Sequence, residues 1–173
     1  QMQIAIAEIG HQMGIKTWIA RNDQHISYGQ GIIGDLPGVI PSVDEVKMFY
    51  SDEIRKAVEY IDAIWIDEEK GRIPAIFEVE HSTGITSGLT RMRKLFDVFG
   101  MLTSSKFIIV SPGNLRTKMA QEANQPVFSN LNAHFMPYTA LQHLYAIMQN
   151  YDVQPPYVDY KIMYAFVESM RVK

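Results

Sequence analysis

The sequence predicts a single α/β domain whose main elements follow the order helix, three strands, helix and strand. Three observations support this prediction: apolar residues change between helical and strand spacing along the chain, turn-forming residues separate these segments, and one strand is apolar almost throughout. The chain has 173 residues, of which 47% are hydrophobic and 20% are charged, so it can bury one substantial core.

The N-terminal part predicts a helix, a strand and a long connection. Helical spacing relates a set of apolar residues: Met2, Ala5, Ile6, Ile9 and Met13. Gly14 favours the end of this helix, and residues 15–20 (IKTWIA) predict a short strand because they are rich in β-branched and aromatic side chains. The glycines and prolines of residues 22–44 predict an irregular connection, and residues 44–60 predict a short helix.

The middle of the chain predicts a hairpin, a helix and a buried strand. Residues 61–67 (IDAIWID) and 73–81 (IPAIFEVEH) have the composition of two strands, joined by the polar, glycine-containing segment EEKGR. Beyond them, an apolar stripe at helical spacing predicts a helix: Leu89, Met92, Leu95, Phe96 and Phe99. Residues 106–112 (KFIIVSP) are almost continuously apolar, which is typical of a strand in a buried parallel sheet.

The C-terminal part predicts further elements of both kinds. Residues 114–124, 139–149 and 157–171 have helical patterns, and a short strand is expected over 134–138. Gln1 stands where an initiating methionine would, already inside the first helical pattern, so we expect the chain to be part of a longer protein.

Composition and charge exclude several classes of function. The formal net charge is −3, so the chain as a whole does not attract nucleic acid or an anionic membrane, and a nucleic-acid site must be a local patch. Because cysteine is absent, disulfides, thiolate metal sites and cysteine nucleophiles are excluded, and we expect a cytoplasmic protein. No apolar run approaches the roughly 18–20 residues that span a bilayer, so we expect no membrane partner.

Three acidic residues gather on one face of the expected hairpin. Side chains alternate along a strand, so Glu78 and Glu80 point to the same side as Ile76. If the hairpin turns about residue 70, Asp62 lies opposite Glu78, with Cβ atoms about 5 Å apart. No lysine or arginine in either strand neutralises these carboxylates, and oxygen ligands with open positions suit Mg²⁺.

Two alternatives to this metal site remain open. The acidic face could simply be solvated, and a shift of the register by one residue would turn Asp62 away from Glu78. A glycosidase with paired carboxylates fits poorly, because Glu78 and Glu80 lie on one strand and do not flank a sugar from two sides.

These residues carry a resemblance to a known superfamily. The order αβββαβ, with an acid in the second strand and acid-x-acid in the third, resembles the PD-(D/E)xK nucleases. More narrowly, residues 10–23 (GHQMGIKTWIARND), 61–65 (IDAIW) and 77–92 (FEVEHSTGITSGLTRM) are similar to prokaryotic restriction-endonuclease-like domains. The resemblance covers residues 1–149 and implies a restriction-endonuclease-like nuclease domain there, with a mixed central sheet flanked by helices. Beyond it, the helical pattern of the chain predicts a C-terminal helical appendage over 150–173.

The resemblance also implies an activity and a set of residues. It suggests an Mg²⁺-dependent DNA endonuclease of restriction or repair type, in which Mn²⁺ substitutes for Mg²⁺ and no small-molecule cofactor is expected. By position, Asp62, Glu78 and Glu80 match the catalytic and metal-binding residues, although Glu80 stands where the signature has lysine. Glu8, on the first helix, matches an additional metal ligand of several branches, and its alternative role is that of a surface carboxylate.

Basic residues near these acids are candidates for contacts with DNA. Arg91, Arg93 and Lys94 lie off the apolar stripe of their helix, and Arg91 is also a candidate substitute for the missing lysine. Arg21 ends the first strand, where ordinary turn chemistry is the alternative explanation. The alternative function is a catalytically inactive DNA-binding or assembly domain of the same fold, which Glu80 and the low basicity favour. The sequence leaves open whether the active unit is a homodimer.

Overall fold

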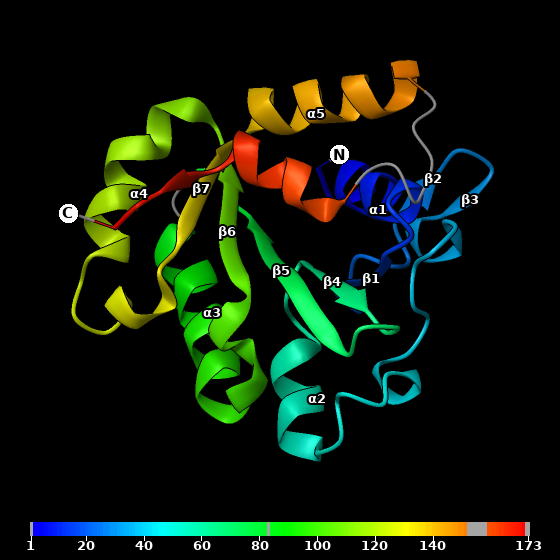
Figure 1. The fold of residues 1–173 in the computed structure, drawn as a ribbon, viewed down its shortest axis with the longest axis horizontal. Helices are drawn as coiled ribbons and strands as arrows, with labels where there is room; N and C mark the ends of the chain where they lie inside the picture. Colours follow the sequence, from blue (N-terminus) through cyan, green and yellow to red (C-terminus); the bar gives the residue numbers. More distant parts are fainter. Residues whose placement is uncertain (1, 83, 152–158, 172–173) are drawn as a thin grey trace.

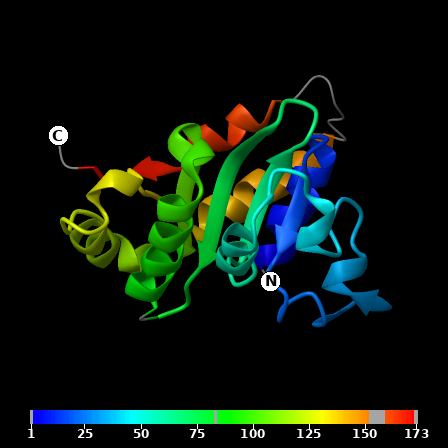
Figure 2. The ribbon, with the colours of Figure 1, turned by 90° about the horizontal axis from the view of Figure 1, so that it is seen from below.

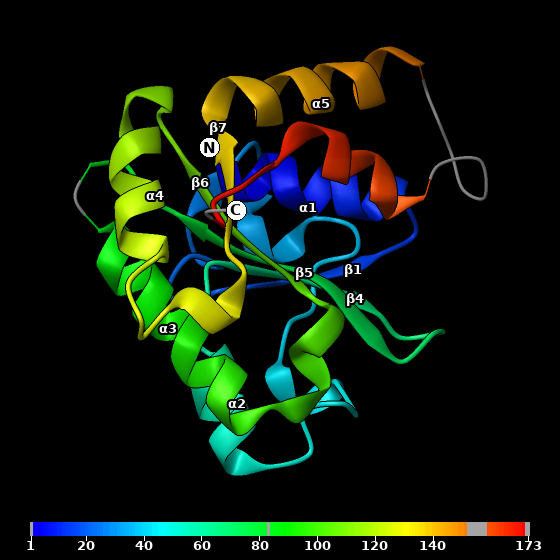
Figure 3. The same cartoon turned by 60° about the vertical axis from the view of Figure 1, so that its left-hand side comes forward.

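The protein consists of three layers, with a central sheet between two layers of helices (Figure 1). The structure, a computed structural model, describes residues 2–82, 84–151 and 159–171. One face of the sheet carries α1 (Met2–Gln12) and α5 (Tyr138–Tyr151), and the other carries α2 (Asp52–Val58), α3 (Ile85–Val98) and α4 (Arg116–Ala123) (Figure 3). Seen from below, α2 and α3 lie in front of the sheet (Figure 2).

The sheet is mixed, as the resemblance implies. Within the described ranges it has six strands, which are in spatial order β1 (Lys16–Ile19), β4 (Ala63–Asp67), β5 (Arg72–Val79), β6 (Lys106–Ser111), β7 (His134–Pro137) and β8 (Glu168–Ser169). The pairs β1–β4, β4–β5 and β7–β8 are antiparallel, whereas β5–β6 and β6–β7 are parallel. A separate two-stranded sheet, β2 (Ser27–Tyr28) with β3 (Gly31–Ile32), lies in the long connection.

Alternating side chains divide the core into two clusters. On the α3 face, Ile76 and Ile109 are fully buried, and on the α1/α5 face Phe77 and Ile108 are almost fully buried. The apolar run of β6 contributes to both clusters, which confirms the prediction of a strand buried on both faces.

The predicted hairpin register is confirmed. Ala63 pairs with Phe77 and Ile64 with Ile76, so Asp62, which directly precedes β4, lies opposite Glu78. The ladder shifts by one residue between Trp65 and Asp67, so that Ile73 and Pro74 together oppose Ile66. Proline has no N–H group to donate to the ladder, which explains an irregularity at this place.

Two predicted helices differ from the structure. Within residues 44–60 only α2 is an α-helix, and it begins where the Ser51 side chain accepts a hydrogen bond from the Ile54 N–H at 3.2 Å. The helix predicted over 157–171 is wrong where the chain is described, because a 3-10 helix (Tyr160–Phe166) leads into β8. The strand β8 in this segment pairs antiparallel with β7, which would otherwise be an edge strand. This long-range backbone pairing overrides the helical pattern of the sequence.

The C-terminal segment packs into the same core as the rest of the chain. Tyr160 and Met163 belong to the cluster on the α1/α5 face, and Met170 belongs to the cluster on the α3 face. The division into a domain over 1–149 and an appendage over 150–173 stays a prediction. Among the helices in the described ranges, none is both long and apolar enough to cross a membrane.

Candidate active site

Asp62, Glu78 and Glu80 lie at the C-terminal end of β5, on the face that α3 covers. Asp62 is fixed to β5 because its carboxylate accepts a hydrogen bond from the Val79 backbone N–H at 2.7 Å. Beyond the last residue of β5, the Glu80 N–H donates to the carbonyl oxygen of Val110 at 2.9 Å, so the pairing with β6 extends to Glu80. The sheet therefore places the three acidic residues at one edge, as the alternation pattern predicts.

Glu78 is a buried carboxylate clamped by an arginine. Its side chain has an exposed fraction of 0%, and the Nε of Arg91 donates to its two oxygens at 3.0 and 3.1 Å. The Nη2 of Arg91 also donates to Glu78. Burial raises the pKa of Glu78 well above its ordinary value; Arg91 opposes this rise, and the negative charges of Asp62 and Glu80 add to it.

Glu80 and Asp62 share the same environment but have fewer partners. The Glu80 side chain is only 12% exposed, and the Nη2 of Arg91 is a distant partner at 3.4 Å. Burial raises the pKa of both Glu80 and Asp62, and in both cases the charge of Arg91 opposes the rise. With all three acids ionised, one guanidinium leaves the cluster negative by two charges, which favours an additional cation.

Two glycines let α3 approach the acids closely. A Cβ atom at Gly84 would overlap the carboxylate of Glu80, and one at Gly88 would lie 3.2 Å from the Cβ of Glu78 and from the Oε1 of Glu80. Gly84 and Gly88 are four residues apart, so they lie on the same side of the first turns of the helix. This spacing is visible in the sequence and is the signal by which the close contact could have been found.

The carboxylate oxygens of Asp62, Glu78 and Glu80 are ligands of the kind that Mg²⁺ prefers. In this arrangement, however, the positive charge beside them is the guanidinium of Arg91. Across the described part of the chain, no three histidine, aspartate or glutamate residues are arranged so that they could hold a metal ion. The convergence of Asp62, Glu78 and Glu80 on a single ion is therefore not seen. The chemistry of the donor set still fits a hard divalent cation, and the assignment of these residues as ligands stays a prediction.

Glu8 lies in a different environment from the cluster. Tyr145, on α5, donates a hydrogen bond to one oxygen of Glu8, and the hydroxyl of Tyr28 lies 3.5 Å from the other. The bond to Glu8 raises the pKa of Tyr145 to about 12. Glu8 thus connects α1 to α5 and β2 in this arrangement, and its role as a metal ligand stays a prediction.

The residues predicted to contact DNA differ in whether an acidic side chain already pairs with them. Arg91 is occupied by Glu78, as described above. Arg93 forms an ion pair with Asp97 at 2.8 Å, and Arg21 forms one with Glu59 at 2.7 Å. Lys94 is exposed on α3. The positive charge of these candidate residues is therefore partly neutralised by neighbouring acids.

Tyr138 is a neighbour of the cluster that the sequence reasoning missed. Its hydroxyl donates to the backbone carbonyl of Glu80 at 3.0 Å and lies 2.7 Å from the Nδ1 of the exposed His81. Tyr138 follows β7, and β5, β6 and β7 are parallel, so residues after these strands meet at the same edge of the sheet. His81 accordingly lies on the α5 side, away from Glu80, as the alternation predicts.

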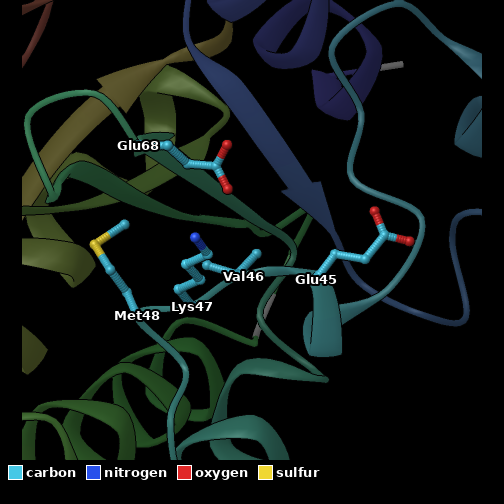
Figure 4. A pocket seen from close by; sticks show the side chains of 5 residues that line it. All are labelled: Glu45, Val46, Lys47, Met48 and Glu68. Carbon is cyan, nitrogen blue, oxygen red and sulfur yellow. The ribbon is translucent and has the colours of Figure 1, made fainter.

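A surface pocket of about 210 Å³ lies elsewhere on the molecule (Figure 4). It is lined by Glu45, Val46, Lys47, Met48 and Glu68. Glu68 follows the C-terminal end of β4, whereas Asp62 precedes its N-terminal end, so the strand separates this pocket from the acidic cluster. The exposed charged residues around the pocket are typical of a solvated surface, and the buried acids are the stronger candidate for chemistry.

Comparisons with known proteins relate the chain to part of a Type II restriction enzyme. The family described as Type II restriction enzyme NmeDI C-terminal domain matches residues 1–170. The Type II restriction enzyme NmeDI of Neisseria meningitidis serogroup C is 45% identical to this chain over 148 residues. That alignment covers 85% of the chain and 42% of NmeDI, so the chain spans less than half the length of this relative. No solved structure matches the chain significantly.

Proposed function

Because the chain belongs to the family of the Type II restriction enzyme NmeDI C-terminal domain, we propose that it is a DNA endonuclease domain of the PD-(D/E)xK superfamily. In this proposal Asp62, Glu78 and Glu80 are its catalytic acids, and it hydrolyses phosphodiester bonds in DNA with Mg²⁺ as the cofactor.

The observation that carries the proposal is the buried acidic cluster around Arg91. Removing carboxylates from water is unfavourable unless they are paired, and here one guanidinium serves Glu78 and Glu80 while Asp62 is held by a backbone N–H. Groups whose pKa values are shifted by burial and by like charges cluster at functional sites more often than elsewhere. The position at the C-terminal edge of parallel strands, which commonly binds ligands in α/β folds, supports the same conclusion.

Each residue has a distinct role in this proposal. Asp62 and Glu78 would hold Mg²⁺, and Glu80 would complete the coordination or orient the attacking water. A bound Mg²⁺ would supply positive charge that stabilises the charge developing on the phosphate. Arg91 would balance one of the three negative charges before the cation binds and would then turn to the phosphate, for which its 35% exposed side chain gives it room.

Plasmid cleavage and metal binding by this chain test the proposal together. We expect nicking in Mg²⁺ or Mn²⁺, and Mn²⁺ binding measurable by calorimetry. Glu80→Ala should weaken both, because it removes one of three anionic ligands. Glu80→Lys restores the commoner signature, so it should bind Mn²⁺ more weakly and keep some cleavage. Glu69→Ala, which removes an exposed carboxylate of the hairpin loop, is the matched control and should change neither.

The second candidate function is a catalytically inactive DNA-binding or assembly domain of the same fold. The clamp of Arg91 on Glu78 favours it, because a guanidinium that never leaves would replace the metal permanently. DNA binding without metal binding or cleavage, in the parent chain, would establish this function and overturn the first.

A further inference from the structure

Ser111 is a buried hydroxyl group that lacks a partner. It is the last residue of β6, its exposed fraction is 0%, and its Oγ has no hydrogen-bond partner among the described residues. Buried hydroxyls in native proteins are almost always hydrogen-bonded, so an unpaired one calls for a physical reason. Such groups often complete their hydrogen bonding with a water, an ion or a second arrangement of a neighbour.

Ser111 is the direct neighbour of Glu80 across the sheet. Val79 pairs with Val110, and the bond from the Glu80 N–H to the Val110 carbonyl continues this parallel ladder, so Glu80 stands beside Ser111. Glu78 and Ile109 pair two residues before Glu80 and Ser111, and both approach Gly88 of α3, which shows that this row of side chains faces α3. By alternation Ser111 faces the same side as Ile109, and hence the acids.

Within the described residues, Glu80 has only a distant partner of its own, the Nη2 of Arg91. Its buried carboxylate has Arg91 as a partner only at 3.4 Å, whereas Glu78 receives the closer bonds of the same guanidinium. A carboxylate with spare acceptor sites and a hydroxyl with a spare donor thus lie on neighbouring strands, whose backbones are about 4.8 Å apart. That separation can be closed by a side-chain rotation or by one bridging water.

We propose that the hydroxyl of Ser111 positions Glu80, by donating a hydrogen bond to its carboxylate directly or through one water when Arg91 leaves the acids for the DNA phosphate. This inference rests on the proposed nuclease function and adds to it a residue outside the signature motif. Ser111 does not contact the substrate, because it is fully buried; it acts through Glu80. Partners that orient a ligating carboxylate in this way commonly change metal affinity or activity by about 10- to 100-fold when they are removed.

Three substitutions of Ser111 separate the hydrogen bond from side-chain volume. Ser111→Ala removes the hydroxyl, Ser111→Cys keeps a similar volume with a weak donor, and Ser111→Thr keeps the hydroxyl. We expect kcat for plasmid nicking to fall about 10- to 100-fold in the Ala and Cys variants, with KM nearly unchanged, and Thr to restore most of the activity. Cleavage by the Cys variant at the parent rate would show that only volume matters and would overturn the proposal.

Thermal unfolding gives a readout that does not depend on cleavage. Without divalent cation the hydroxyl of Ser111 is unpaired, so Ser111→Ala should leave Tm unchanged or raise it, while the rise in Tm caused by Mn²⁺ should be smaller than in the parent. Thr17→Val is the matched control. Thr17 is also fully buried with an unpaired hydroxyl, but it lies in β1 and its side chain contacts α1 at Gly10, so this variant should keep the parent's cleavage and Mn²⁺ response.

The outcomes distinguish this inference from the function on which it rests. A parent chain that neither binds Mn²⁺ nor nicks DNA overturns the nuclease function and, with it, the role of Ser111. A parent that does both, with a Ser111→Ala variant that matches it in kcat and in the Mn²⁺ response, overturns the role of Ser111 alone. A lower Tm of the metal-free Ser111→Ala variant, with kcat unchanged, would assign Ser111 a purely structural role.

Discussion

Replacing Arg91 by methionine should destabilise the protein, because it leaves Glu78 without its cation. Removing one partner of a buried ion pair costs about 3–5 kcal/mol, since the other charge stays buried. Glu78 is fully buried, but the Arg91 side chain is 35% exposed, so solvent screens part of the interaction and the lower end, about 3 kcal/mol, is expected. For a domain of this size, that loss corresponds to a Tm lower by roughly 6–12 °C.

The loss should depend on pH in a direction set by Glu78. Burial already raises its pKa, and without Arg91 this pKa rises further. Near pH 4 a glutamate is largely protonated in the unfolded chain as well as in the folded variant, so keeping Glu78 neutral in the fold costs little. At this pH the variant is therefore only slightly less stable than the parent. As the pH rises above that value, the unfolded chain releases a proton that the folded variant retains. The free energy of unfolding of the variant therefore falls until the pH passes its raised folded-state pKa.

Urea unfolding at pH 5 and pH 8, without divalent cations, measures this effect. Arg93→Met is the matched control on the same helix. Arg93 pairs with Asp97, whose side chain is 51% exposed, and donates an exposed hydrogen bond to the Val127 carbonyl at 3.3 Å, so the loss should be only about 1 kcal/mol at both pH values. The reasoning would be refuted by an Arg91→Met variant that is as stable as the parent at pH 8, or by one whose loss is equal at both pH values.

Three further predictions follow from single contacts. Gly84→Ala should reduce DNA cleavage more than stability, because its Cβ displaces the flexible carboxylate of Glu80; cleavage rates and Tm measured on one preparation check this. Lys94→Ala should reduce the salt dependence of DNA binding by about one unit of slope, as a titration at several salt concentrations would show. Burial, together with the charge of Lys106, lowers the pKa of His134 to about 4. The unfolded chain therefore binds a proton that the folded protein does not, and the stability of the protein should fall as the pH falls from about 6.5 to about 4. In the His134→Asn variant the midpoint of urea unfolding should change less with pH over that range.

The sequence was sufficient for the elements that depend on local periodicity. The first helix and the apolar strand over 106–112 have strong patterns and appear where they were expected, within a few residues. The final helix failed because its pattern was amphipathic but its backbone pairs with β7, a long-range interaction that local periodicity does not contain. The clamp of Arg91 on Glu78 was not predicted, because it depends on how closely α3 approaches β5. The sequence signal for that approach is the spacing of Gly84 and Gly88, which local periodicity does not use.

The position of Asp62 shows how a local irregularity decides the composition of the site. Next to the turn Asp67 pairs with Arg72, and an unbroken ladder counted from that pair would put Asp62 opposite Phe77, on the α1/α5 face. The extra residue at Pro74 shifts the register by one, so Asp62 instead lies opposite Glu78 and faces α3. A proline that cannot donate to the ladder is therefore part of what gathers the acids on one face, although it lies far from them along β5. Substitutions in the hairpin that restore a regular ladder would turn Asp62 away from the cluster without altering any of its three acids.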